Sequence, residues 1–114
     1  MNNLTLPDWA KETNCAITVC DADCKIIYMN DKSREVNAKF GNPVGHNLMD
    51  YHGERARGII RELLASGGVN CYTISKNGGK KMIYQSAWRE NGRVAGLVEI
   101  SMEIPEDMPH YVRG

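Results

Sequence analysis

The sequence predicts an α+β domain with a five-stranded antiparallel sheet, with short helices and one longer helix packed on one face. Polar and apolar residues alternate near both ends of the chain, in residues 15–29 and 69–103. Helical patterns are confined to the block between these stretches. Strands and helices segregated in this way are typical of an antiparallel sheet that carries its helices together. If the first hairpin joins the later strands, one five-stranded sheet results.

Residues 69–103 predict three antiparallel strands joined by two tight turns. Asn77-Gly78-Gly79 and Asn91-Gly92 supply residues that accept a positive φ, which a two-residue hairpin turn requires. Residues 80–90 and 93–103 keep a period of two, so their side chains alternate between the two sheet faces. A three-stranded sheet needs a cover for its apolar face, and the preceding residues must provide it.

One face of these strands is expected to point outward. This interpretation assigns Ile83, Ala95 and Leu97 to an apolar outer strip. Such a strip needs a cover, which either the N-terminal segment or a second copy of the chain provides. The residues alone leave both covers open.

The N-terminal third predicts a cap and a hairpin. Residues 1–13 form a lead-in helix in this interpretation, with Pro7 in its first turn and Trp9 as its anchor. Residues 14–20 and 25–29 are then two strands joined by an acidic turn.

The middle of the chain predicts the helices. Asn30 or Asp31 caps a helix over residues 32–40, residues 48–51 form a further short turn, and residues 54–66 form the longer helix. Apolar residues recur there with helical spacing, at Ala56, Ile59, Ile60, Leu63 and Leu64. The folded domain thus spans residues 14–104, and residues 105–114, which contain two prolines within five residues, are a tail or linker.

Composition excludes several partner classes. Fourteen basic and fourteen acidic residues balance, which argues against nucleic acid and against a membrane surface. No apolar run is long enough to span a membrane, and the first residues lack the pattern of a secretion signal. The four cysteines are therefore expected to be reduced thiols in the cytoplasm. Cys20 and Cys24 alone do not complete a zinc site.

The ordered pattern resembles a PAS domain over residues 14–103. Residues 17–23 resemble its first strand and acidic turn, and residues 25–30 resemble its second strand with the characteristic final Asn. Gly45-His46-Asn47-Leu48 stands where that family often has Gly-x-x-Leu, and residues 96–101 resemble the last strand. The resemblance implies a sensory module that encloses a pocket and acts through a dimer or a downstream signalling protein, in signal transduction or the regulation of transcription. Because that family dimerises through this sheet surface, the resemblance favours a homodimer. Whether the chain acts alone or is a piece of a longer protein stays open.

Three kinds of pocket content are left open: haem, flavin, and a small organic ligand or none. His52, or else His46, is the candidate axial ligand for haem, as the resemblance implies. Flavin is less favoured, because Asn70-Cys71 is followed by Tyr72 where the light-sensing subclass has Arg. Aromatic rings with a polar tip suit a pocket for an organic ligand. The candidate binding residues are His52, His46, Tyr51, Ile60, Tyr72, Tyr84 and Trp88.

No catalytic motif stands out. The serines lack a nucleophile-elbow pattern, and no glycine-rich phosphate loop follows a strand. The expectation is therefore that the chain is not an enzyme. The alternative is a small isomerase-like α+β enzyme, which would require Asp21, Asp50 and His52 to converge.

Overall fold

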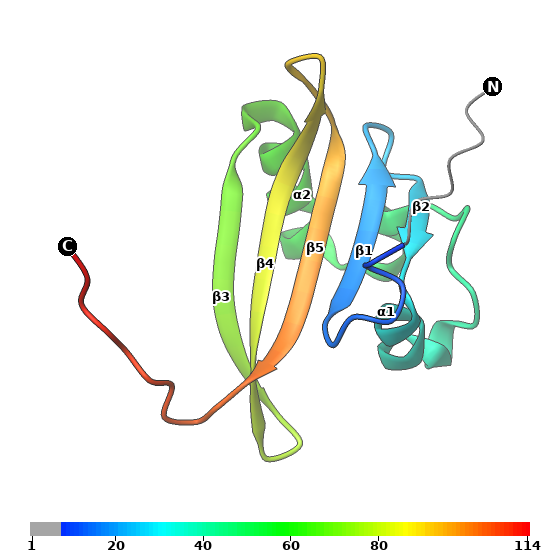
Figure 1. Cartoon of the computed structure of the whole chain (residues 1–114). Coiled ribbons are helices and arrows are strands. Elements are labelled where there is room, and N and C mark those ends of the chain that lie inside the picture. Colours follow the sequence, from blue (N-terminus) through cyan, green and yellow to red (C-terminus); the bar gives the residue numbers. More distant parts are fainter. Residues whose placement is uncertain (1–7) are drawn as a thin grey trace.

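The computed structural model describes residues 8–114 and has one five-stranded antiparallel sheet (Figure 1). The strands are β1 (Ala16–Asp21), β2 (Ile26–Met29), β3 (Val69–Lys76), β4 (Gly79–Glu90) and β5 (Arg93–Ile104). The helices are α1 (Asp31–Val36), the 3-10 turns η1 (Ala38–Phe40) and η2 (Leu48–Tyr51), and α2 (Glu54–Ser66). The strand order is β2-β1-β5-β4-β3, so β1 joins the first hairpin to the last strand. The predicted α+β class is confirmed.

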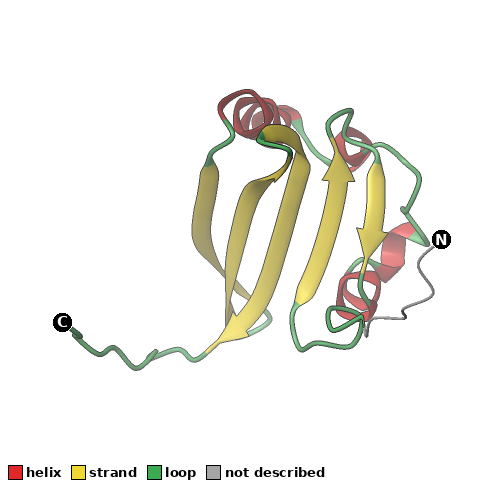
Figure 2. Ribbon diagram, turned by 45° about the horizontal axis from the view of Figure 1, so that its top comes forward, coloured by secondary structure: helices red, strands yellow, loops and turns green. Residues whose placement is uncertain are grey.

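The helices lie on one face of the sheet (Figure 2). Helix α2 packs against β5 and β4, while α1 packs against β1 and β2. We call the sheet face beneath these helices the inner face, and the opposite one the outer face. Residues 105–114 extend from the end of β5 without helix or strand (Figure 1). Within residues 8–114, no helix has the length and apolar character that a membrane crossing needs.

The two predicted hairpin turns are present. Asn77 and Gly78 have φ values of 53° and 76°, and Asn91 and Gly92 have 52° and 80°. Two consecutive positive φ angles twist a hairpin in the sense that the strands require. The turns therefore fix the pairing of β3, β4 and β5.

The helical block differs from the prediction in one place. A single helix over residues 32–40 is wrong, because α1 ends at Val36 and a separate 3-10 turn follows. At the break, the Asn37 side chain donates to the Ser33 carbonyl oxygen (2.8 Å) and so competes with the helical hydrogen bonds. Helix α2 has the predicted bounds and ends at Gly67, whose φ of 70° is left-handed.

The described part of the lead-in segment is not helical. Asp8–Asn14 consists of turns and bends, and the Trp9 side chain is 77% exposed, so it anchors nothing. Residues 1–7, with Pro7, lie outside the described part of the chain. A buried amide holds this segment instead: Asn30 Nδ2 donates to the carbonyl oxygens of Ala10 and Cys15, both at 2.8 Å.

The same Asn30 amide also joins β1 to α1. Its Oδ1 accepts from Ile17 N (2.9 Å) and from Ser33 N (3.0 Å). All four hydrogen-bonding positions of the amide are thereby used. The capping role predicted for this residue is confirmed, and its bonds to Ala10, Cys15 and Ile17 go beyond that prediction.

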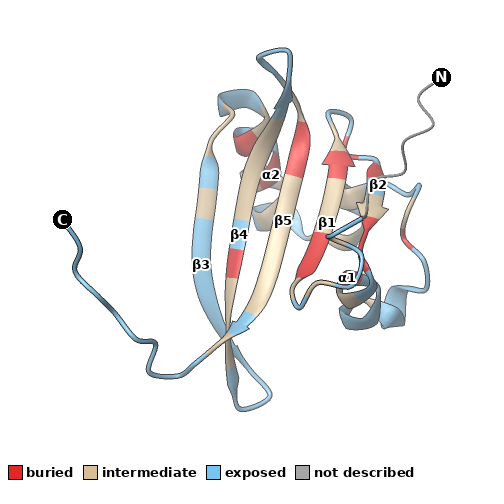
Figure 3. Ribbon diagram, in the orientation of Figure 1, coloured by how far each residue is buried: buried red, intermediate tan, exposed pale blue. Residues whose placement is uncertain are grey.

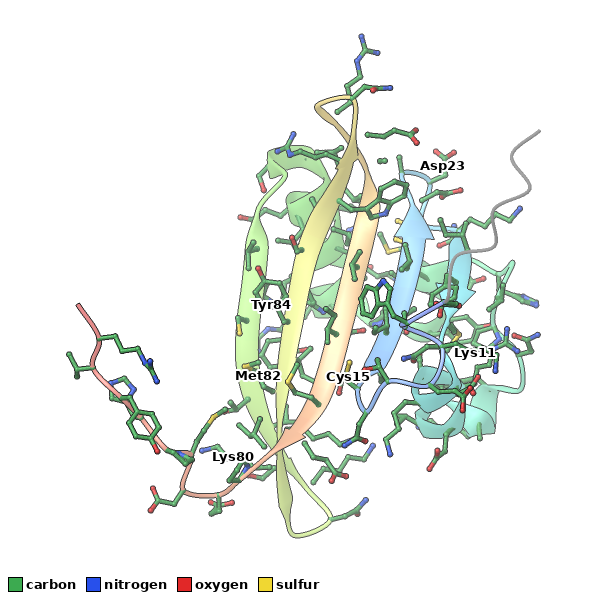
Figure 4. All side chains as sticks on the ribbon, viewed as in Figure 1. Lys11, Cys15, Asp23, Lys80, Met82 and Tyr84 are labelled. Atoms are coloured by element: carbon green, nitrogen blue, oxygen red, sulfur yellow. The ribbon has the colours of Figure 1, made fainter. Side chains whose placement is uncertain are left out.

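The predicted assignment of sheet faces is wrong. Leu97 and Ile83 are buried on the inner face, and Ala95 shares their side of β5. The outer face instead carries Met82 and Tyr84, which are labelled in Figure 4. Their register partners Met102 and Ile100, and Val98 on the same side of β5, share this face. Both faces of β4 and β5 carry apolar residues. The alternation of side chains along these strands therefore does not indicate which face the helices cover.

The buried core is small and lies at one end of the sheet. It joins Cys20 and Cys24 to Leu97 and to Ile60 and Leu63 of α2. Figure 3 shows most buried positions on β1, β2 and this end of β5, whereas β3 is largely exposed. The space under the first half of α2 is therefore not filled by the core.

Gly96 allows a cross-strand contact that joins β1 to the C-terminal strands. Trp88 pairs with Gly96, and its indole Nε1 reaches across to donate to the Cys20 carbonyl oxygen (2.9 Å). A Cβ at position 96 would overlap that carbonyl oxygen and lie 2.7 Å from Trp88 Nε1. Only glycine leaves room for this crossing.

We expect Gly96→Ala to lower the free energy of unfolding by about 3 kcal/mol, because the methyl group must push β1 or the Trp88 indole aside. Gly58→Ala is the matched control, since Gly58 lies inside α2 with open space around its Cβ position. That control should stabilise the protein by about 0.5–1 kcal/mol. Urea unfolding measures both values, and a Gly96→Ala protein as stable as wild type would contradict the contact.

Candidate functional site

A cavity of about 690 Å³ lies between the first half of α2 and the inner face of β3, β4 and β5. Pockets for small organic ligands commonly enclose about 300–1,000 Å³, so this one has a suitable size. Its wall comes from α2 and its floor from the three C-terminal strands. These two sides differ in chemistry.

The wall is apolar. Ala56, Ile59 and Ile60 line the cavity from successive positions of one α2 face. They belong to the predicted apolar stripe, whose later residue Leu63 enters the core beside Ile60. The stripe therefore serves two purposes: its second half packs against the sheet, and its first half faces the cavity.

The floor carries a row of polar side chains across the strands. Asn70, Gln85 and Glu99 are register partners on β3, β4 and β5, so their side chains lie side by side. Asn70 Nδ2 donates to Gln85 Oε1 (2.9 Å), and Gln85 Nε2 donates to Glu99 Oε1 (3.4 Å). We call these three residues the polar row. Thr18 on β1 is the next register partner and shares a hydrogen bond with Ser33 of α1.

Glu99 gives the floor a negative charge. Within residues 8–114 the one ion pair is Lys11–Asp31, so Glu99 has no cationic partner there. Burial raises the pKa of the Tyr72 hydroxyl above its ordinary value, and the negative charge of Glu99 raises this pKa further. Tyr72 lines the same cavity, so the negative electrostatic potential of Glu99 extends into the site.

His52 lies at the rim, where η2 leads into α2. Its Nδ1 is 2.8 Å from the Leu48 carbonyl oxygen. A carbonyl oxygen only accepts, so in the neutral ring Nδ1 carries the proton and Nε2 keeps a free lone pair. Arg57 Nε donates to the carbonyl oxygens of Met49 and His52, at 2.9 and 2.8 Å, and so ties η2 to the start of α2.

Three of the seven candidate residues meet at this cavity: His52, Ile60 and Tyr72. His46 is exposed on its loop, and the Tyr51 ring packs against Phe40 with 5.0 Å between ring centroids. Neither of them lines the cavity.

Tyr84 and Trp88 are placed wrongly by the sequence interpretation, because both lie on the outer face. Tyr84 pairs with Ile100 and appears there in Figure 4, and the Trp88 indole is engaged with Cys20. Side chains an even number of positions apart share a face, so Trp88 cannot join Gln85 on the inner one.

The sequence interpretation missed the polar row. A signal for it exists, because Gln85 and Glu99 are polar residues in the middle of long strands, away from either turn. Their mutual placement depends on the register, which the alternating pattern alone does not specify.

The cysteine pair is a buried structural feature. Cys20 and Cys24 belong to the core, and burial raises the pKa of Cys20 to about 11. Burial also raises the pKa of Cys24. Thiols that resist ionisation are poor metal ligands and poor nucleophiles. In the part of the chain that the structure covers, no three His, Cys, Asp or Glu residues are grouped as a metal site would need.

No protein-family model matches the sequence, and no curated protein matches it either. Solved structures do resemble the fold. The PAS domain of the histidine kinase ThkA aligns with a TM-score of 0.63 and 18% identity, over 79% of this chain and 99% of that domain. A PAS domain from Colwellia psychrerythraea aligns with a TM-score of 0.62 and 20% identity, over 83% and 90% of the two chains. A C-terminal domain from Streptococcus mutans aligns with a TM-score of 0.67 and 20% identity, over 82% and 78%.

We expect Glu99→Gln to lower the pKa of the Tyr72 hydroxyl, because the substitution removes a nearby negative charge. In the wild type this pKa should exceed the ordinary value of about 10. NMR titration of the tyrosine ring carbons measures it for each tyrosine. Tyr28 is the internal control: partial burial and its hydrogen bond to Asp8 raise its pKa, and Glu99 plays no part. An unchanged Tyr72 pKa would show that the charge of Glu99 does not reach the cavity.

Proposed function

We propose that this chain, which has the PAS fold, is a signal-sensing module that binds a small organic ligand in the cavity under α2 and performs no catalysis. The observation that carries the proposal is the cavity itself. This space is open to solvent on one side and holds about 690 Å³, which lies within the range that pockets for small organic ligands occupy. Its apolar wall and polar floor match the usual composition of ligand pockets.

Ligand binding would act on the position of α2. A molecule in the cavity contacts Ile59 and Ile60 on one side and the polar row on the other. It therefore favours arrangements in which the first half of α2 lies close to β4 and β5. Because Arg57 ties η2 to the start of α2, a shift of the helix is passed to the loop before it.

A small organic ligand fits the cavity better than haem does. His52 could supply Nε2 as an axial ligand, and the Nδ1 contact with Leu48 would fix the ring. The floor opposite, however, carries Gln85 and the carboxylate of Glu99, where a porphyrin would need an apolar surface. Covalent attachment of a flavin has no support either. Cys71 is exposed, and it pairs with Tyr84, so its side chain lies on the outer face and not in the cavity.

The isomerase alternative has no observation in its favour. Of Asp21, Asp50 and His52, only His52 lines the cavity. Asp21 Oδ1 accepts from the backbone nitrogens of Asp23 and Lys25, both at 2.9 Å, and so serves the β1–β2 turn. We place the module in the cytoplasm because all four cysteines are free thiols.

Native mass spectrometry of the purified protein tests the ligand proposal. We expect a bound organic molecule in the wild type and its loss in Ala56→Trp, because the indole fills the cavity. Glu62→Trp is the control, since Glu62 is exposed on the same helix and should leave the ligand in place. A Soret absorption band that His52→Ala removes would replace the organic ligand with haem. Ligand retention that is equal in wild type and Ala56→Trp would contradict a cavity site.

We further propose that the outer face is where two copies of the chain meet and where the signal leaves the domain. Apolar side chains of β4 and β5 lie on this face. The segment before β1 is held beside β1 and β2 by Asn30 and by the hydrogen bond of Tyr28 to Asp8. An exposed apolar surface of this kind marks an interaction site. The homodimer therefore stays a proposal, but its contact surface is Val98, Ile100 and Met102 in place of the predicted strip of Ile83, Ala95 and Leu97.

Light scattering after gel filtration tests the dimer. We expect a dimer for the wild type and a folded monomer for Ile100→Lys, because the ammonium group cannot be buried between two apolar faces without a partner. Glu62→Lys, on the exposed side of α2, should remain dimeric. A wild type that is monomeric at high concentration would refute the dimer and leave the ligand proposal standing.

A further inference from the structure

We propose that the cavity selects ligands with a protonated amine, which Glu99 anchors, and with an apolar body that packs against α2. This inference rests on the proposed ligand-binding function and adds the chemical class of the ligand. Four observations support it: the direction of the hydrogen bonds in the polar row, the unpaired charge of Glu99, the chemistry of Tyr72 and the shape of the wall.

The polar row points its donors toward Glu99. Asn70 donates to Gln85, and Gln85 donates in turn to Oε1 of Glu99. The row occupies one carboxylate oxygen and leaves the other for a ligand. None of the described buried side-chain polar atoms lacks a partner, so this second oxygen is not sealed inside the protein.

The charge of Glu99 is not neutralised by the rest of the cavity. Arg55 and Glu54 also line it, but both are exposed at its mouth and carry opposite charges. Glu99 is half-buried on the floor and has no ion-pair partner within residues 8–114. An ammonium group bound there would form a charge-assisted hydrogen bond, which is about twice as strong as a neutral one.

Tyr72 adds a second feature that favours a cation. Burial raises the pKa of its hydroxyl, and the negative charge of Glu99 adds to this rise, so the Tyr72 ring lies within electrostatic reach of the carboxylate. An aromatic face attracts a cation, and at a half-exposed ring such as that of Tyr72 this attraction raises the affinity about two- to fivefold. A protonated amine near Glu99 would thus meet a carboxylate and an aromatic ring in one place.

The apolar wall indicates the chemistry of the part of the ligand that does not contact Glu99. Ala56, Ile59 and Ile60 offer only hydrocarbon to the cavity, so they favour an aromatic or branched aliphatic body over a sugar or a polyphosphate. A phosphate or carboxylate head group would be repelled by Glu99. The expected class is an amine with a compact apolar body.

Three probes of similar size separate the head groups: 2-phenylethylamine, 2-phenylethanol and phenylacetate. Titrations followed by two-dimensional ¹H–¹⁵N NMR give the dissociation constant and the site together. We expect shifts in residues 56–60, 70–72, 85 and 99, with the amine bound at least about tenfold more tightly than the alcohol and phenylacetate weakest.

The matched variants are Glu99→Gln and Glu103→Gln. Glu99→Gln keeps an oxygen that can accept from Gln85 and should remove the roughly tenfold preference for the amine. Glu103 lies on the same side of β5 but is exposed and does not line the cavity, so its variant should keep the preference.

Two failures are distinguishable. Cavity binding of the alcohol or phenylacetate as tight as that of the amine would overturn the amine class and leave the ligand-binding function intact. Absence of shifts in the cavity residues for all three probes would also overturn this inference. Native mass spectrometry would then decide the general proposal of a ligand in this cavity: a molecule bound to the wild type and lost in Ala56→Trp supports it, and equal retention contradicts it.

Discussion

The register of four neighbouring strands decides which side chains face the cavity. Thr18, Glu99, Gln85 and Asn70 are partners across β1, β5, β4 and β3, and so form one continuous polar line. A slip of one residue in any strand would turn its member of that line to the opposite face. Two features protect the register: Asn-Gly turns at both C-terminal hairpins, and the crossing of Trp88 over Gly96 to β1.

The architecture could be predicted because its signals are local. Alternation, Asn-Gly turns and the apolar stripe of residues 54–66 each report on a short stretch of chain. The division of residues 32–40 into α1 and a 3-10 turn was not foreseen, since it depends on the Asn37 side chain reaching Ser33. The turns of residues 8–14 were also missed, because their main anchor is Asn30, which lies far along the sequence.

The site could be predicted only in part, for a reason that lies in β4 and β5. Each of these strands presents apolar residues on both sides, such as Ile83 and Met82, or Leu97 and Val98. The sequence interpretation therefore assigns Tyr84 and Trp88 to the pocket side and Leu97 to the outer face, whereas the structure has them on the opposite sides. Three predicted residues do line the cavity. Ile60 and His52 belong to an amphipathic helix and its entry loop, whose apolar stripe indicates the side that faces the sheet. Tyr72 was a candidate because its ring is apolar and its tip is polar.

The central claim is that a ligand lies between α2 and the polar row, on the inner face of the sheet. Intermolecular nuclear Overhauser effects from a bound probe such as 2-phenylethylamine to methyl-labelled protein test it most directly. The account predicts contacts to the methyl groups of Ala56, Ile59 and Ile60. Contacts to Val98, Ile100 and Met102 instead would place the ligand on the outer face and contradict the account.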